Sequence, residues 1–243
     1  MKNYVNNALG LIGCIALLGL SSQVIADNEK KSSTNPVGGG SGWNAEVKKA
    51  EPTAKTADGF ALTEDAQKVV QSVSDYFNAL TDLKGEFAQT NPDNKRAEGR
   101  FYLKRPGKLR FDYAPPSAMR IVADGKWLSV EDHDLKSSEQ YPLESTPFRL
   151  LMKEKVDLLK DARLVDVTVG ESIVVMTVTD KEDDGTGQLK LFFAYPEIAL
   201  QQWIITDPQG LETKIELTNH VLNEKQHEKF FETAKFGLSI VED

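Results

Sequence analysis

The stretch that most constrains the fold of this chain runs from Gly99 to Pro116 and reads GRFYLKRPGKLRFDYAPP. Two segments in which apolar and polar side chains alternate flank a Pro-Gly pair, and alternation of this kind is the period of a β-strand. Pro106 fixes φ, and Gly107 supplies the positive φ that a type II turn requires. The sequence therefore predicts a β-hairpin.

One face of this hairpin is apolar apart from a single arginine. Period two places on that face Phe101, Leu103, Leu109, Phe111 and Tyr113, together with Arg105. A guanidinium on a core-facing side is costly unless fixed acceptors pair with it. Alternatively, the strand ends at Lys104, and Arg105 reaches solvent beside the turn. Spacing leaves both interpretations open.

The rest of the chain from Leu83 onward also favours antiparallel strands. Turn signals follow one another at intervals typical of sandwiches and barrels, at residues 91–94, 106–107, 114–116, 124–125, 133–134, 183–185 and 207–210. Between them we expect strands that include SAMRIVAD, KWLSVED, ESIVVMTVTD, GQLKLFFAY, ALQQWIIT and ETKIELTNHV.

Two helical segments interrupt this pattern. The first is predicted from Glu64 to Leu80, with Thr63 as N-cap and an apolar stripe at spacings of three and four. The second begins at the Thr146-Pro147 pair, read as N-cap and first helical residue, and continues through TPFRLLMKEKVDLLKD. Such helices could close the open side of a half-barrel, or they could pack on a sheet in an ordinary α+β domain.

The ends of the chain carry less information. Residues 1–26 read as a secretory signal peptide, because a short apolar run is followed by a Val24-x-Ala26 cleavage site. Cys14 lies in a lipoprotein-like Leu-Ile-Gly-Cys string, but lipidation there would leave an apolar run directly behind it. Residues 27–58 are predicted to be a disordered leader, and residues 59–243 one domain. Near the C-terminus we expect a helix-like turn around Phe230 and a short strand at Leu238 to Val241.

Composition and motifs argue against several classes of function. The formal net charge of −8 disfavours nucleic acids and anionic lipid surfaces as partners. The three histidines do not stand near a serine or cysteine in a nucleophile motif. The Asp183-Asp184-Gly185 string lacks the spaced ligands of a calcium loop, and no zinc, phosphate-loop or dinucleotide pattern occurs. We therefore expect no enzyme activity, no cofactor and no metal.

The ordered strings KRPGKLRFDY, AMRIVADGKWLSV and TPFRLLM resemble the periplasmic outer-membrane lipoprotein carrier proteins of the LolA type. The resemblance extends from about Leu62 to the C-terminus. It implies a mainly antiparallel β fold with helices (α+β), an incomplete and strongly curved β-barrel whose apolar hollow is covered by short helices. It also implies that Arg105 is a lid latch, and that Leu109 lies at the rim and takes part in exchange with partners.

The function implied by this resemblance is that of a soluble, monomeric periplasmic chaperone. It would accept lipoproteins released by an inner-membrane ABC transporter, shield their acyl chains and deliver them to an outer-membrane lipoprotein receptor. Candidate residues for the acyl-chain cavity are Phe101, Leu103, Leu109, Phe111, Tyr113, Met119, Ile121, Phe148 and Leu151. From the residues alone, the same side chains could equally fill an ordinary core.

Two other functions remain open at this stage. The chain could be the anchored receptor of the same system, which is similar in fold but carries an acylated N-terminal cysteine. It could also be an unrelated periplasmic lipid-binding or hydrolytic domain. Binding of an acyl probe and the mass of the mature N-terminus would separate these alternatives.

Overall fold

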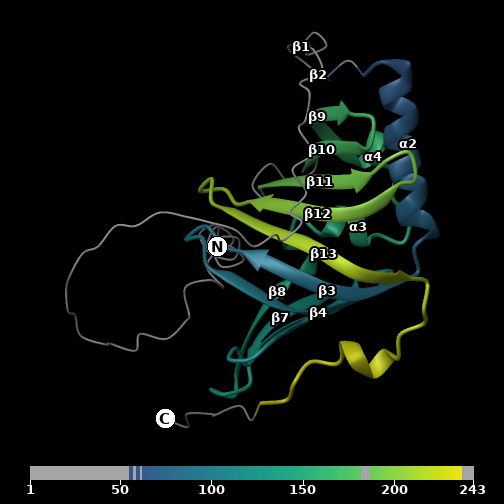
Figure 1. Ribbon diagram of the computed structural model, residues 1–243. Coiled ribbons are helices and arrows are strands. Elements are labelled where there is room, and N and C mark those ends of the chain that lie inside the picture. The colour runs from purple at the N-terminus through teal and green to yellow at the C-terminus, as the bar shows by residue number, and fades with distance from the viewer. Residues whose placement is uncertain (1–54, 57–58, 61, 182–186, 237–243) are drawn as a thin grey trace, which may run out of the picture.

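The structure is a computed structural model that describes residues 55–56, 59–60, 62–181 and 187–236 (Figure 1). The predicted signal peptide, most of the predicted leader, the turn at 183–185 and the strand expected at 238–241 lie outside these residues. Two short strands, β1 (Lys55–Thr56) and β2 (Gly59–Phe60), pair with each other at the start of the described part.

The main body is an eleven-stranded antiparallel sheet within the described residues, with the order β8-β7-β6-β5-β4-β3-β13-β12-β11-β10-β9. Its strands are β3 (Asp82–Thr90), β4 (Arg96–Lys104), β5 (Lys108–Tyr113), β6 (Met119–Asp124), β7 (Trp127–Asp132), β8 (Ser137–Pro142), β9 (Ala162–Val169), β10 (Ile173–Asp180), β11 (Gln188–Ala194), β12 (Ala199–Thr206) and β13 (Glu212–Leu222). Strands β8 and β9 are the two edges and do not pair, so the barrel is unclosed. The predicted fold class is confirmed.

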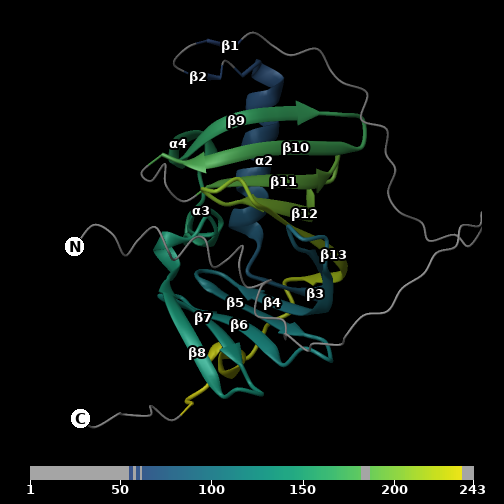
Figure 2. The ribbon, with the colours of Figure 1, turned by 90° about the vertical axis from the view of Figure 1, so that its left-hand side faces the viewer.

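The sheet is strongly curved. The pairing register shifts within three neighbouring pairs, β9 with β10, β11 with β12, and β13 with β3. An extra residue in one strand bends it and increases its local twist. Figures 1 and 2 show the strands fanning from β9 to β8, with α2, α3 and α4 on the concave side.

Helix α2 (Glu64–Ala79) forms as the apolar stripe predicts. The Thr63 Oγ1 atom accepts a hydrogen bond from the Ala66 N–H at 3.2 Å, which confirms the N-cap. The stripe buries Val70, Val73 and Phe77, and the ring of Phe77 meets that of Phe193 on β11 edge to face at 5.9 Å. Helix α2 thus covers the half of the sheet that contains β9–β12.

The second predicted helix, residues 146–161, is instead two short helices, α3 (Arg149–Met152) and α4 (Leu158–Asp161), and the turn η1 (Leu143–Ser145) precedes them. The prediction of Thr146 as N-cap is wrong, because its hydroxyl donates a hydrogen bond to the Leu143 carbonyl at 2.7 Å. Helix α3 ends where Lys153 adopts an extended ψ of 151°. Asp157 then caps α4 by accepting from the Lys160 N–H.

The hairpin of β4 and β5 is confirmed, but its loop has three residues, because Lys104 pairs with Lys108. Gly107 adopts the expected positive φ of 75°. A Cβ atom at this residue would lie 2.8 Å from the Cα of Gly125 in the neighbouring β6–β7 turn. The position therefore requires glycine for both its conformation and its close packing.

The C-terminal segment, residues 223–236, lies against the outer side of β4–β7 (yellow in Figure 1). Its turn η2 (Glu228–Phe231) confirms the helix-like turn expected around Phe230. Glu228 pairs with Lys104 and Lys108, and these ammonium groups lower the pKa of its carboxyl to about 2. Further along, the Ala234 N–H donates to the buried carboxylate of Glu131 at 2.6 Å.

Candidate functional site

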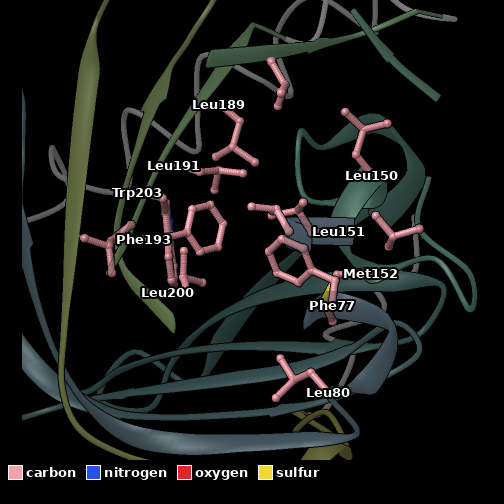
Figure 3. Packing of buried hydrophobic residues seen from close by; sticks show 14 of the residues in the cluster. Phe77, Leu80, Leu150, Leu151, Met152, Leu189, Leu191, Phe193, Leu200 and Trp203 are labelled. Atoms are coloured by element: carbon pink, nitrogen blue, oxygen red, sulfur yellow. The ribbon is translucent and has the colours of Figure 1, made fainter. Parts of the chain in front are cut away.

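The concave side of the sheet encloses two small apolar cavities of about 40 and about 30 Å³. Pockets that hold small-molecule ligands usually measure about 300 to 1,000 Å³, so each cavity is far smaller than a ligand site. The hollow is therefore nearly filled by side chains in this structure. Figure 3 shows how the side chains of α2 and α3 point toward those of β11 and β12 across it.

A separate open groove of about 900 Å³ lies outside the hollow. Its lining includes the hairpin loop, the β6–β7 turn, Trp127 and the charged side chains of Glu144, Lys153 and Glu154. Although it is larger, its charged and open lining is unlike that of a lipid site. The two enclosed cavities are therefore the candidate site.

The structure brings the predicted cavity residues together, with one exception. The first cavity is lined by Leu109, Phe111, Tyr113, Ile121 and Phe148, and the second by Phe101, Leu103, Leu109, Phe111, Phe148 and Leu151. Met119, at the start of β6, is half-buried and lines neither cavity. Whether these side chains contact cargo stays a prediction.

Four side chains are shared by the two cavities and form the wall between them: Leu109, Phe111, Phe148 and Trp203. The Trp203 ring meets Phe111 edge to face at 6.2 Å and Phe148 at 5.8 Å. Phe148 belongs to the segment that leads into α3, whereas the other three side chains come from the sheet. Displacement of α3 would therefore move Phe148 out of this wall.

Arg105 links the hairpin to the residues that follow α2 and α3. Its backbone N–H donates to the Thr81 carbonyl, just beyond α2, at 2.8 Å. Its guanidinium Nη2 donates to the carbonyl of Lys153, at the end of α3. The adjacent Gly107 N–H donates to the Met152 carbonyl at 3.0 Å. The hairpin loop thus binds the last carbonyl groups of α3, which lack partners within the helix.

Both sequence interpretations of Arg105 contain part of this result. The strand does end at Lys104, yet the side chain of Arg105 does not simply reach solvent, because it lines the second cavity and holds α3. Burial lowers the pKa of its guanidinium, which remains charged at neutral pH. Of the two helical segments predicted from the sequence, the one that begins at Pro147 supplies the acceptor of the guanidinium hydrogen bond, the Lys153 carbonyl.

The polar end of the first cavity is formed by Tyr113 and Gln89. The Tyr113 hydroxyl donates to Gln89 Oε1 at 2.6 Å, and the Gln89 amide donates to Asn91 at 2.6 Å. Burial raises the pKa of the Tyr113 phenol. The phenol therefore stays neutral and serves as a hydrogen-bond donor.

Leu109 is not exposed at a rim, as the sequence resemblance implied. Its side chain is 4% exposed and lies in the wall between the cavities. The next residue inward on the same face, Phe111, packs against Phe101, Phe87 and Trp203. The rim interpretation of Leu109 is therefore wrong, since its alternation with Arg110 keeps it on the concave face.

Sequence reasoning missed Trp203. Strict alternation along β12 places Leu200 and Trp203 on opposite faces, because they are three residues apart. In the structure Gln201 is an extra residue opposite Phe192 and Phe193, and both Leu200 and Trp203 are buried on the concave side. The bulge, which no turn residue marks, changes the face of every residue that follows it.

Asn78 on α2 anchors the segment between α3 and α4. Its side-chain amide donates to the Val156 carbonyl at 2.8 Å, and its Oδ1 accepts from the Val156 N–H at 2.8 Å. Nearby, Ser74 Oγ accepts from the Leu158 N–H at 3.1 Å. The segment from α3 to α4, residues 149–161, which we call the lid segment, is thus attached to α2 near one end and to the hairpin near the other.

We expect Asn78→Ala to lower the free energy of unfolding by about 1 to 2 kcal/mol, because two hydrogen bonds to the lid backbone are lost. For a domain of this size the melting temperature would fall by roughly 2 to 8 °C. Gln71→Ala on the same helix is the control, since within the described residues that exposed side chain donates a hydrogen bond only to Asp75, one turn along the helix. Equal melting of the two variants would show that the Asn78 contacts do not hold the lid.

The amino-acid sequence is similar to those of one protein family. The sequence profile described as "Outer membrane lipoprotein carrier protein LolA" matches residues 78–234. An outer-membrane lipoprotein carrier protein of Chromobacterium violaceum is 25% identical over 76% of this chain and 90% of its own length. One of Methylobacillus flagellatus is 30% identical over 61% of this chain and 76% of its own.

Among solved structures, a LolA-superfamily protein of Nitrosomonas europaea aligns with 68% of this chain and 97% of its own, at 10% identity and a TM-score of 0.41. A DUF1329-family protein of Desulfovibrio piger aligns with 71% of this chain and 98% of its own, at 11% identity and a TM-score of 0.46. Within the described residues, no helix has the length and apolar character needed to cross a membrane.

Proposed function

This chain belongs to the LolA family of outer-membrane lipoprotein carrier proteins, and on that premise we propose that it is a soluble periplasmic chaperone for lipoproteins. It would accept lipoproteins released from the inner membrane, shield their acyl chains in the hollow and deliver them to an outer-membrane receptor. The observation that carries the proposal is the apolar hollow, beside which the hairpin loop binds the carbonyl groups at the end of α3.

Energetics explain why such a carrier needs a hollow that opens. Each CH₂ group removed from water is stabilised by about 0.8 kcal/mol, so an anchor with several acyl chains does not leave a membrane for water. The carrier must offer an alternative apolar surface of similar extent. The two cavities are too small for this, so binding requires α3 and Phe148 to move away from the sheet.

Closure of the lid would then compete with cargo. The hydrogen bond from Arg105 to the Lys153 carbonyl forms in the closed state, and a charge-assisted bond of this kind contributes about 1.5 to 3 kcal/mol. Stabilising the empty state lowers the affinity for cargo by the same free energy. A receptor with greater affinity could then remove the lipoprotein. Loading from a bilayer requires an energy-coupled donor, for which we propose an inner-membrane ABC transporter.

The proposal is tested by incubating the purified protein with a triacylated lipopeptide that carries a fluorescent label. We expect a one-to-one soluble complex that releases the lipopeptide to receptor-containing membranes. A protein with a filled, rigid core would bind neither this lipopeptide nor a simple acyl probe. That result would favour a periplasmic domain of another class.

The mature N-terminus separates the carrier from the anchored receptor. We expect the mature protein to begin at Asp27, because Val24-x-Ala26 forms the cleavage site and Cys14 lies within the apolar run before it. Mass spectrometry of the protein isolated from cells measures this directly. A diacylglyceryl-modified Cys14 in the membrane fraction would instead identify the receptor.

A further inference from the structure

Two buried hydrogen-bond donors in the wall of the hollow have no acceptor. Among the described residues, neither Trp203 Nε1 nor Arg105 Nε has a hydrogen-bond partner. Both side chains line the second cavity, and Trp203 also lines the first, but the surface of the second cavity is wholly apolar, so the two donor atoms lie behind it in this closed state. Trp203 is 6% exposed, so bulk water does not replace the missing partner.

Such groups are uncommon in folded proteins and call for an explanation. Burying an N–H group without an acceptor costs free energy, and most buried polar side chains are paired. Replacing Trp203 by an all-carbon side chain would avoid this cost in the closed state. Its ring packs against Phe111 and Phe148, which phenylalanine could also do.

The chemistry of the two groups defines what would satisfy them. An indole N–H is a donor only, and so is a guanidinium. A ligand must therefore bring acceptor oxygens into a hollow that otherwise contacts hydrocarbon. A fatty-acyl group has this composition, because a long alkyl chain ends at a carbonyl oxygen.

Resting on the proposed function, we infer that Trp203 is a specificity-determining residue whose indole N–H donates a hydrogen bond to an acyl carbonyl oxygen of the cargo. Trp203 stands in the wall between the cavities, where Phe148 would leave when α3 moves. The site recognises a carbonyl next to a long chain, as in the ester and amide linkages of a lipoprotein anchor. A free fatty acid shares this chemistry and differs in carrying a carboxylate, which Arg105 would favour.

The test compares three probes of similar length, methyl dodecanoate, dodecanoic acid and tetradecane, in displacement of a fluorescent acyl probe. We expect Trp203→Phe to lower the ratio of ester to tetradecane affinity by about five- to tenfold, since one net hydrogen bond is lost. Trp127→Phe, on the outer groove and 44% exposed, is the matched control and should leave the ratio unchanged. An unchanged ratio in Trp203→Phe would overturn the inference.

Comparison of dodecanoic acid with methyl dodecanoate distinguishes a free fatty acid from a lipoprotein anchor as the ligand that supplies the carbonyl. If the ester and a triacylated lipopeptide lose affinity in Trp203→Phe, the indole recognises the linkages of the anchor. If only dodecanoic acid loses affinity, the site selects free fatty acids, and the inference about lipoprotein cargo is wrong. Failure of all three probes and of the lipopeptide to bind the wild-type protein would contradict the proposed function itself.

A measurement on the unaltered protein covers the case in which Trp203→Phe does not fold. The chain has three tryptophans, so its amide spectrum contains three indole N–H signals. We expect the Trp203 signal to move downfield with methyl dodecanoate but not with tetradecane. The same response to both probes would show that aromatic rings satisfy the N–H and that it does not recognise a carbonyl.

Discussion

Leu109→Glu is expected to lower the free energy of unfolding by more than about 4 kcal/mol, because it removes a buried leucine and places a carboxylate in an apolar wall. Leu109 is 4% exposed among Phe111, Phe148 and Trp203, and Arg105, which lines the second cavity with it, already donates to the Lys153 carbonyl. Circular dichroism should show a melting temperature at least 8 °C below that of the wild type, given roughly 2 to 4 °C per kcal/mol for this size.

The same substitution at Leu135 is the matched control for this experiment. Leu135 lies in the turn between β7 and β8 and is 76% exposed, so Leu135→Glu should change stability by no more than about 0.5 kcal/mol. A Leu109→Glu protein that melts like the wild type yet fails to exchange cargo would contradict the buried position. It would restore the interpretation of Leu109 as a rim residue that contacts partners.

Arg105→Leu is expected to increase affinity for a triacylated lipopeptide by about 10- to 100-fold and to slow its release to the receptor by a similar factor. The substitution removes a bond of about 1.5 to 3 kcal/mol that stabilises the closed state, and each 1.4 kcal/mol is tenfold in affinity. It also adds apolar lining to the second cavity, where Arg105 lies. Arg105→Lys should be intermediate, because an ammonium does not reproduce the guanidinium fork.

Arg96→Leu is the control for Arg105→Leu. Arg96 begins β4, at the end of the strand away from the hairpin loop. In the described part of the chain, the exposed Arg96 pairs only with the exposed Glu98 and with Glu216 at 3.9 Å, so its loss should leave binding and release unchanged. Transfer of labelled lipopeptide from carrier to receptor measures both variants. If a folded and loaded Arg105→Leu protein transfers the lipopeptide at the wild-type rate, the hydrogen bond to Lys153 does not control release.

Local sequence patterns predict the hairpin, most strands and helix α2. Alternation and turn residues identify the β4–β5 hairpin and most strands of the sheet, and helix α2 follows from a capped apolar stripe. Strand β8 was not among the strands named, because its sequence SSEQYP is polar and exposed at the sheet edge. An edge strand of this kind carries little of the alternation on which the prediction depends.

Two parts of the site depend on contacts that no local pattern contains. The hydrogen bond between Arg105 and Lys153 joins residues 48 positions apart, so spacing could not decide between a buried and an exposed arginine. Thr146 has the sequence of an N-cap, but the chain bends at η1 and directs its hydroxyl to Leu143. In both cases tertiary packing determines the outcome and the local signal is ambiguous.

The most direct test of the central claim is amide hydrogen exchange at Gly107 before and after binding of a triacylated lipopeptide. In the closed protein this buried N–H donates to the Met152 carbonyl at 3.0 Å, so its exchange reports whether the hairpin loop holds α3. We predict strong protection in the empty protein and loss of that protection in the complex, while the amides of the central strand β3 stay protected. Protection of Gly107 that persists in a stoichiometric complex would contradict opening of this lid.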